Sequence, residues 1–311
     1  MIVFVTRPVP QAALQLLRDG GLDVRLRLDE SPIPRPDLLE GAAQADALLC
    51  MLTDRVDAEV MDAGALRVIS NVAVGVDNID LAAAKARGIP VTNTPGALTD
   101  ATADMTLALL LAVARRVPEG DAMVRRGEFN GWGPMMMLGA DLRGHTLGIV
   151  GPGRIGKAVA ERARAFGLEI LVAARQDHPD VGPRAPLDEL LQRSDFVSLH
   201  CPLTPQTHHL LDARRLGLMK PSAFLVNTAR GPVIDEGALV QALRSGAIAG
   251  AALDVYEREP AVHPGLLDLS NVVLAPHTGS ATHRTRTAMA TMAARDIVSI
   301  SQGRAPQHRV A

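Results

Sequence analysis

The chain has almost no aromatic side chains, very few cysteines and almost no net charge. Aromatics make up 2% of its 311 residues, and Trp132 is the sole tryptophan, so the core must be built from Ala, Leu and Val. The net charge of −2 gives no indication of nucleic acid or an anionic membrane as a partner. An anionic substrate must therefore be captured by a local site.

The sequence also predicts no disulfide, no signal peptide and no membrane-spanning segment. Cys50 and Cys201 lie in apolar stretches, which predicts two buried thiols in a reducing cytoplasm. The N-terminus lacks a basic n-region, and its apolar run is too short for a signal peptide. The longest apolar stretch, 105–114, contains a threonine and precedes two arginines, so we expect a buried helix and a cytoplasmic protein without membrane attachment.

Short apolar runs alternate with amphipathic stretches along the whole chain. This pattern is typical of an α/β fold, in which a parallel sheet carries helices on both faces. In the first half we expect strands at 2–6, 23–28, 48–52 and 68–72, and helices at 11–18, 58–63 and 81–87. In the second half we expect six strands, at 147–150, 169–174, 196–200, 223–228, 250–254 and 272–275.

The order of these elements predicts two doubly wound domains. Long helical patterns over 100–116 and 281–301 connect them, so we expect a domain of residues 97–284 inserted into a discontinuous one of residues 1–96 and 285–311. We expect a loop between 118 and 147 and a poorly ordered end over 302–311. The three methionines 135–137 indicate adaptable packing, and we expect no metal site, because no Cys or His adjoins them.

The most informative motif is GPGRIG at residues 151–156. Gly151 allows a tight turn, Gly153 lets the backbone approach a pyrophosphate, and Gly156 lets the following helix pack closely. The helix is expected over 157–166, and its N-terminus attracts an anion. The motif alone is weak, but an apolar strand precedes it and a helix follows it, so we predict a dinucleotide site.

The residue pair after the next strand bears on the choice of dinucleotide. An NAD site usually has Asp or Glu about 20 residues beyond the glycines to bind the ribose hydroxyl. Here Ala174 is uncharged and Arg175 follows, and an arginine pairs with a 2′-phosphate. The pattern favours NADPH over NADH; the alternative is that Arg175 is a solvated surface residue.

Arg230, Glu259 and His277 each follow a predicted parallel strand, where α/β sheets bind ligands. A guanidinium clamps a carboxylate, a histidine gives or takes a proton near neutral pH, and an adjacent carboxylate favours and orients the imidazolium. Each has a structural alternative: a loop arginine, a helix-start residue, and a histidine that satisfies backbone groups.

Taken together, the motifs resemble the D-isomer-specific 2-hydroxyacid dehydrogenases over nearly the full length, and within them the glyoxylate/hydroxypyruvate reductase subgroup. The matching segments are 74–80 (VGVDNID), 151–156, 200–204 (HCPLT), 227–231 (NTARG), 254–260 and 276–277, with 48–54, the Trp132 loop and 279–286 for the subgroup. The resemblance implies a Rossmann domain inserted into a flavodoxin-like substrate domain, and a homodimer. Asp104 and Pro152 depart from the commoner Glu and small or aliphatic residue, and neither change removes a required group.

The resemblance also implies a role for each matched residue. Arg230 would bind the substrate carboxylate and keto oxygen, His277 would protonate that oxygen as hydride arrives, and Glu259 would pair with His277. Backbone at Val74 and Gly75 would cradle the carboxylate. Leu52 would also contact substrate, as would Trp132 in the neighbouring subunit, where packing is the alternative. The implied cofactor-binding residues are Thr102, Gly151, Gly153, Arg154, Ile155, Gly156, Arg175, Gln176, Cys201, Pro202, Thr207, Thr228, Ala229, Asp254 (on the nicotinamide carboxamide), His277 and Gly279.

The expected function is NADPH-dependent reduction of glyoxylate or hydroxypyruvate to the D-2-hydroxyacid. The carboxylate at Glu259 argues against formate, since formate-oxidising members have an amide there. Other 2-oxoacids such as 2-ketogluconate or phenylpyruvate remain alternatives; phosphohydroxypyruvate is disfavoured because no regulatory extension follows residue 311. A nucleotide-sensing binding protein on the same fold is an alternative of another class, because fold does not fix function.

Overall fold

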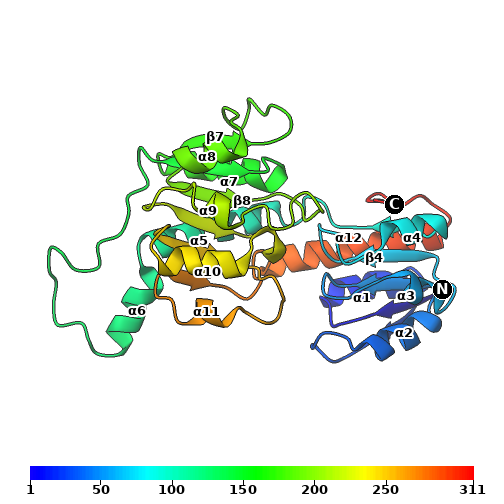
Figure 1. Ribbon diagram of the computed structural model, residues 1–311. Helices are drawn as coiled ribbons and strands as arrows, with labels where there is room; N and C mark the ends of the chain where they lie inside the picture. Colours follow the sequence, from blue (N-terminus) through cyan, green and yellow to red (C-terminus); the bar gives the residue numbers. More distant parts are fainter. The chain divides into compact units, whose positions relative to one another are not determined.

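The computed structural model describes all residues, 1–311, and divides into two compact units (Figure 1). Unit 1 comprises Met1–Leu98 and Ala281–Ala311, and unit 2 comprises Thr99–Ser280. The first boundary was expected after residue 96 and lies after residue 98. The second was expected after residue 284 and lies after residue 280. No helix is both long and apolar enough to cross a bilayer.

Unit 1 is a five-stranded parallel sheet with helices on both faces. The strand order is β2-β1-β3-β4-β5, the flavodoxin-like order. Its elements are β1 Ile2–Val5, α1 Gln11–Asp19, β2 Asp23–Leu26, α2 Arg35–Ala43, β3 Ala47–Cys50, α3 Ala58–Asp62, β4 Val68–Asn71, α4 Leu81–Ala86, β5 Val91–Thr92 and α12 His283–Ser301.

Unit 2 is a six-stranded parallel sheet in the order β11-β10-β9-β8-β6-β7. Its elements are α5 Thr99–Ala114, α6 Val117–Arg125, β6 Thr146–Val150, α7 Arg154–Ala165, β7 Glu169–Ala173, α8 Leu187–Arg193, β8 Phe196–Leu199, α9 Ala213–Leu216, β9 Phe224–Asn227, the 3₁₀ turn Gly231–Val233, α10 Glu236–Arg244, β10 Gly250–Leu253, α11 Pro264–Leu267 and β11 Val272–Leu274. A single parallel bridge, Val172 to Arg184, stands where a Rossmann sheet has its third strand.

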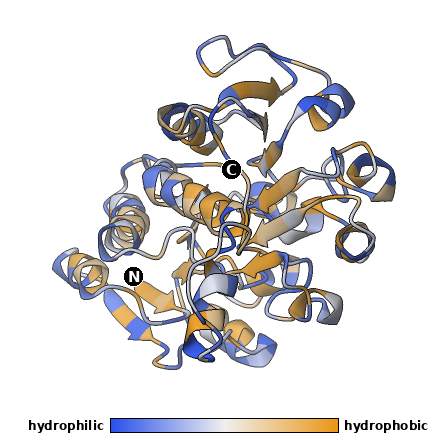
Figure 2. Cartoon of the chain, turned by 90° about the vertical axis from the view of Figure 1, so that its left-hand side faces the viewer, coloured by the Kyte–Doolittle hydropathy of each residue, from blue (hydrophilic) through white to orange (hydrophobic).

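Each sheet is buried between two layers of aliphatic side chains, as the scarcity of aromatics requires. In unit 1 one layer lies under α1 and α12 and the other under α2, α3 and α4. In unit 2 α5 and α7 cover one face, and α8 and α10 help to cover the other. The strands are accordingly coloured as hydrophobic almost throughout (Figure 2). The predicted α/β fold class, with two parallel sheets and a Rossmann unit, is confirmed.

The predicted strands are all present, but several end earlier than the sequence indicates. Residues Thr6, His200, Thr228, Asp254 and Ala275 lie just beyond the last paired residue of their strands. Four of these five residues are polar, and all but His200 are buried, so the chain remains in the interior for one residue after the strand ends. Helix α7 likewise begins at Arg154 and not at Lys157.

No range was predicted for α2, β5 and α6, nor for the helices α8, α9, α10 and α11 of unit 2. Helix α2 has a proline in its first turn, and β5 is only two residues long, too short for a periodic pattern. Helix α6 lies inside the region expected to be a loop, and none of its residues is buried. An apolar stripe facing the core is the signal that identifies a helix, and α6 has none.

The expectation of a poorly ordered end at 302–311 is wrong. Val310 N donates to Val91 O (2.8 Å) and Val91 N donates to Ala311 O (3.2 Å), so the last residues pair with β5. Arg309 bridges Thr92 in antiparallel register. The exposed edge of β5 offers unpaired backbone groups, and the chain end satisfies them.

Candidate active site

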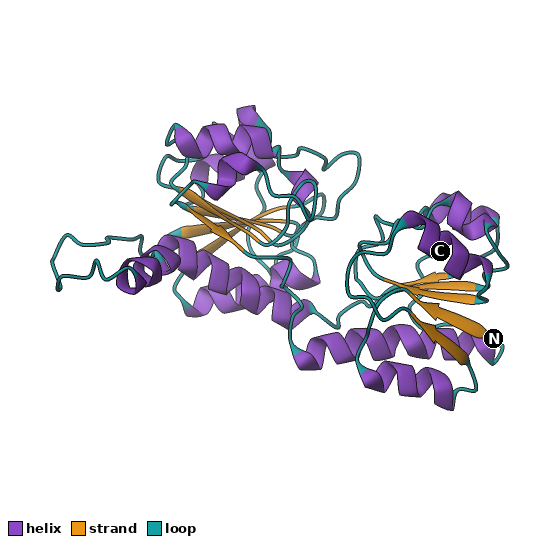
Figure 3. Ribbon diagram, turned by 90° about the horizontal axis from the view of Figure 1, so that it is seen from below, coloured by secondary structure: helices purple, strands orange, loops and turns teal.

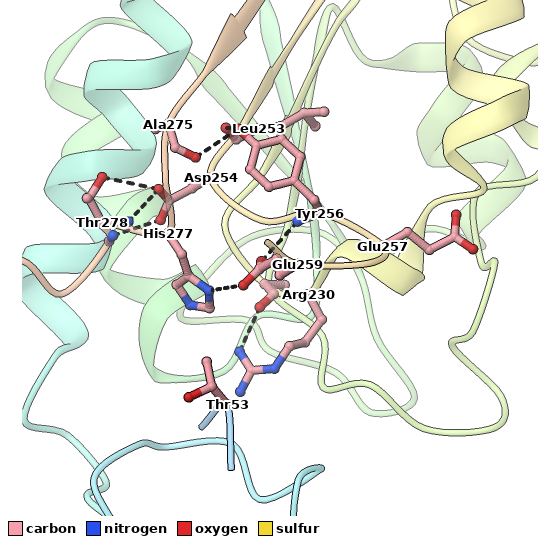
Figure 4. Close-up of polar contacts among 12 residues, drawn as sticks. Thr53, Arg230, Leu253, Asp254, Tyr256, Glu257, Glu259, Ala275, His277 and Thr278 are labelled. Carbon is pink, nitrogen blue, oxygen red and sulfur yellow. Dashed lines mark hydrogen bonds and ion pairs between the residues drawn. The ribbon is translucent and has the colours of Figure 1, made fainter. Parts of the chain in front are cut away.

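Arg230, Glu259 and His277 lie together in unit 2, at the carboxyl ends of β9, β10 and β11 (Figure 4). His277 Nδ1 is 2.8 Å from Glu259 Oε2, and the His277 ring is about a quarter exposed (26%). Arg230 lies on the same side of the loops, and its Nη1 donates to the carbonyl of Ala229 (2.8 Å). The three strand-end residues that the sequence singled out are therefore neighbours.

The electrostatics of Glu259 define the protonation of the pair. Burial tends to raise the pKa of Glu259, but the hydrogen bond and charge of His277, the N–H of Tyr256 and the charge of Arg230 outweigh it, so the pKa lies below the ordinary 4.5. An ionised carboxylate only accepts hydrogen bonds, so His277 Nδ1 must carry the donated hydrogen. The proton that His277 can give or take is therefore the one on Nε2.

The loop carrying His277 is fixed by a buried carboxylate. His277 has φ of 54°, a left-handed conformation that a non-glycine residue seldom adopts without support. Asp254, only 1% exposed, accepts from the N–H groups of Thr278 and Gly279, each at 2.7 Å. Asp254 thus holds the backbone immediately after His277; the nicotinamide contact expected of it stays a prediction.

The Arg230 loop depends on Asn227 and Gly231, two residues of the NTARG motif for which no role was predicted. Asn227 accepts from Ala229 N (3.0 Å) and donates to Arg230 O (2.9 Å), which sets the turn. Gly231 packs against the backbone of Tyr256 and Glu257, where a Cβ would overlap it. The two loops that carry Arg230 and Glu259 can therefore touch only because residue 231 has no side chain.

The glycine turn has the geometry that a dinucleotide requires. Gly151 has φ of 89°, and a Cβ there would lie 2.7 Å from Cys201 N. A Cβ on Gly156 would lie 2.6 Å from Gly151 O, whereas Gly153 has open space around it. Helix α7 has no side-chain cap, so N–H groups of its first turn, at Arg154 and Ile155, are left for a phosphate. These residues fit a pyrophosphate.

Several of the remaining predicted cofactor residues form hydrogen bonds that shape loops after the strands of unit 2. Thr207 accepts from Thr204 N (2.8 Å) and donates to Pro202 O (2.6 Å), shaping the loop after β8. Thr102 Oγ1 donates to Gly279 O (3.3 Å), and Thr228 Oγ1 is 2.9 Å from that of Thr106. After β7 the chain continues with the half-buried Ala174, and the next two residues, Arg175 and Gln176, are exposed.

Residues His200 and Cys201, whose backbone packs against Gly151, carry no charge. Burial lowers the pKa of His200 to about 3, and its neutral ring lies 2.8 Å from Ser198 Oγ. Burial raises the pKa of the Cys201 thiol to about 11, so the sulfur is not a thiolate. Both cysteines are buried and free, as expected. A neutral neighbour beside the glycine turn does not repel a pyrophosphate.

Leu52, Val74 and Gly75 lie in unit 1, beyond the carboxyl ends of β3 and β4. Asn78 Nδ2 donates to Met51 O and Asp54 O, both at 3.0 Å, and so fixes the turn that carries Leu52. Val74 and Gly75 are half-buried, and their N–H groups have no acceptor within the chain.

Trp132 lies on a projecting arm of unit 2, formed by α6 and the loop up to residue 140 (Figure 3). The tryptophan is 82% exposed, which removes packing within the chain as its role. Six of the ten exposed large apolar side chains of the molecule belong to this arm: Val117, Val124, Phe129, Trp132, Met135 and Leu138.

Comparisons with known proteins identify the family of the chain. Residues 107–279 match the family model described as D-isomer specific 2-hydroxyacid dehydrogenase, NAD binding domain. A glyoxylate reductase of Thermococcus litoralis is 48% identical, with 99% of this chain and 96% of that protein covered.

Two solved structures extend the agreement to the whole fold. The TT0316 protein of Thermus thermophilus is 50% identical with a TM-score of 0.96 and full coverage of both chains. The NADPH-dependent glyoxylate/hydroxypyruvate reductase of Sinorhizobium meliloti, in complex with NADP and malonate, is 33% identical with a TM-score of 0.88, covering 100% and 96% of the two chains.

The motifs, the two parallel sheets and these relatives lead to one conclusion. The chain belongs to the D-isomer specific 2-hydroxyacid dehydrogenase family and is an NAD(P)H-dependent 2-hydroxyacid dehydrogenase.

Proposed function

We propose that the enzyme reduces glyoxylate, and hydroxypyruvate as a second substrate, to the D-2-hydroxyacid with NADPH. The observation that carries the proposal is the His277–Glu259 pair beside Arg230: an acid, its orienting carboxylate and an anion clamp in one place. The relatives with the same architecture are named as glyoxylate reductases.

Each unit offers donors that suit a carboxylate. In unit 2 the Arg230 guanidinium supplies a bidentate, charged donor for the carboxylate and the keto oxygen of the substrate. In unit 1 the N–H groups of Val74 and Gly75, which have no acceptor in the chain, supply neutral donors for a carboxylate. Leu52 contributes apolar contact, which suits a small substrate.

His277 acts as the general acid. When bound, the reduced nicotinamide supplies the hydride that adds to the carbonyl carbon. His277 Nε2 gives its proton to the carbonyl oxygen as negative charge develops there, and the positive charge of the ring stabilises that oxygen beforehand. The ionised Glu259 accepts from Nδ1 and so fixes the orientation of the ring, with Nε2 left for the substrate. Asp254, placed behind the loop, would also reach the nicotinamide carboxamide.

The cofactor preference rests on the end of β7. Ala174 offers no carboxylate to repel a 2′-phosphate, and the exposed Arg175, with Gln176 beside it, is available to pair with one. The glycine turn with Arg154 and Ile155 holds the pyrophosphate, and the residues of the 102, 201–207, 228–229 and 279 segments complete the site.

We further propose that the enzyme is a cytoplasmic homodimer joined through the projecting arm. The arm exposes six large apolar side chains, including a tryptophan, whose contact with water is unfavourable. Burying Trp132 against a second copy, at its substrate site, would remove that cost.

Steady-state kinetics with a panel of 2-oxoacids and both cofactors test the proposal. We expect the largest kcat/KM with glyoxylate or hydroxypyruvate and NADPH, and lower values with 2-ketogluconate and phenylpyruvate. A higher kcat/KM with NADH, or with the bulkier oxoacids, would contradict the assignment. Nucleotide binding without turnover of any 2-oxoacid would favour a nucleotide-sensing role.

A further inference from the structure

Three successive peptide groups of the 73–76 loop in unit 1 are anchored by their carbonyl oxygens. Ala73 O accepts from Thr94 N (2.9 Å), Val74 O accepts from Asn93 Nδ2 (2.7 Å), and Gly75 O accepts from Asn71 Nδ2 (2.9 Å). Two asparagine side chains and one backbone N–H therefore hold three consecutive carbonyls.

This anchoring determines where the N–H groups point. In a planar trans peptide the N–H is directed opposite to the carbonyl of the same unit. Because the Val74 carbonyl is turned toward Asn93, the Gly75 N–H is turned away from it and has no acceptor in the chain. The same holds for the N–H of Val74, whose peptide carbonyl is held by Thr94. The orientation of these donors thus depends on the segment that carries Asn93 and Thr94.

Asn93 is itself held by the end of the chain. Its N–H donates to His308 O (3.2 Å), next to the pairing of β5 with Val310 and Ala311. We call residues 307–311 the C-terminal strap. The strap lies along β5, so β5 and Asn93 are bounded on one edge by β4 and on the other by the strap.

The strap is fixed to helix α12 by a buried carboxylate. Asp296, 1% exposed, accepts from Gln307 N (2.8 Å) and from His308 Nδ1 (2.9 Å). A buried carboxylate without such partners is costly, so these two hydrogen bonds favour the docked strap. A continuous series of contacts therefore runs from Asp296 through His308 and Asn93 to Val74.

We propose that Asn93 is a positioning residue for recognition of the substrate carboxylate, and that the C-terminal strap holds it in place through the His308–Asp296 pair. The inference rests on the proposed function, because it assigns the Val74 and Gly75 N–H groups to a carboxylate. Asn93 does not touch the substrate; it orients the peptide groups that do.

The test compares the wild type with Asn93→Leu, His308→Ala and His308→Asn. Leucine has nearly the shape of asparagine but no amide to hold the Val74 carbonyl. We expect KM for glyoxylate to rise about tenfold in Asn93→Leu, with a smaller change in kcat and an unchanged KM for NADPH. His308→Ala should raise KM about threefold, and His308→Asn, which keeps a donor for Asp296, should restore it.

A second measurement reports the loop without relying on turnover. Amide hydrogen exchange of the peptide spanning 72–78 should be faster in Asn93→Leu and His308→Ala, and unchanged in His308→Asn and in the matched control Gln15→Ala, which removes an exposed hydrogen bond on α1. Should Asn93→Leu fail to fold, the two His308 variants decide the matter by the same KM and exchange readouts.

The outcomes separate this inference from the proposed function. A wild type that reduces no 2-oxoacid defeats the proposed function and this inference with it. A wild type active on glyoxylate, with KM for the Asn93 and His308 variants within twofold of its own, defeats this inference alone.

Discussion

The two units have the same kind of sheet but offer different groups at the ends of their strands. In unit 2 the turn after β6 is glycine-rich, and charged side chains follow β9, β10 and β11. In unit 1 the turn after β1 holds two prolines, and the loop after β4 presents backbone N–H groups oriented by asparagines. The two units share a kind of fold, and their loops differ. The loops of unit 2 suit dinucleotide binding and proton transfer, and the loop after β4 in unit 1 suits binding of an anion.

The contrast also concerns how each region is held in place. In unit 2, close packing at glycine allows the loops carrying Arg230 and Glu259 to meet. In unit 1, hydrogen bonds from Asn71 and Asn93 fix peptide groups that a sequence pattern does not reveal. Changes at His277 and Glu259 in unit 2 should therefore alter the chemical step, and changes at Asn93 in unit 1 should alter substrate binding.

The largest effect is expected from His277→Ala. Without the acid, kcat should fall about a hundred- to ten-thousand-fold, because the proton and the positive charge at the carbonyl oxygen are both lost. The affinity for NADPH should change little. Steady-state kinetics and a fluorescence titration with NADPH check both statements, with His178→Ala in a polar loop as the control. Turnover near that of the wild type would remove His277 from its assigned role.

A smaller but still large effect is expected from Gly231→Ala. The added Cβ would overlap the backbone of Tyr256 and Glu257, so the Arg230 and Glu259 loops must separate. We expect kcat/KM to fall about a hundredfold, since small misplacements of reacting groups have effects of that size. Gly120→Ala on α6, where a Cβ meets only Met137 at 3.8 Å, is the matched control. Equal kinetics for the two variants would show that the loops do not need this contact.

The smallest effect concerns the nucleotide end of unit 2. Arg175→Ala should lower kcat/KM for NADPH about tenfold and leave that for NADH nearly unchanged, because only the 2′-phosphate loses a partner. Arg193→Ala, which removes an exposed ion pair with Glu189, controls for the loss of a surface charge. If both cofactors are affected equally, Arg175 does not select between them.

The sequence predicted much of unit 2 because its signals are local. The glycine turn and the three strand-end residues are short patterns with a direct physical meaning, and the sheet topology brings strand ends to one edge. The contacts of Gly231 and Asn227 follow from loop packing, which no periodicity encodes. The strap was missed for the same reason: its partners, Val91 and Asp296, are remote in sequence or hidden in a helix pattern.

In the proposed mechanism an ionised Glu259 holds His277 in the orientation from which Nε2 donates a proton. Because the pKa of Glu259 lies below its ordinary 4.5, the carboxylate is charged throughout the neutral range, and its support is lost only as pH falls through that lowered pKa. The pH dependence of kcat for wild type and Glu259→Gln tests this most directly. We expect the variant to have a lower kcat through the neutral range and to lack the acid limb that protonation of Glu259 produces in the wild type, since an amide does not titrate and accepts the Nδ1 hydrogen without a negative charge. Superimposable profiles would contradict it.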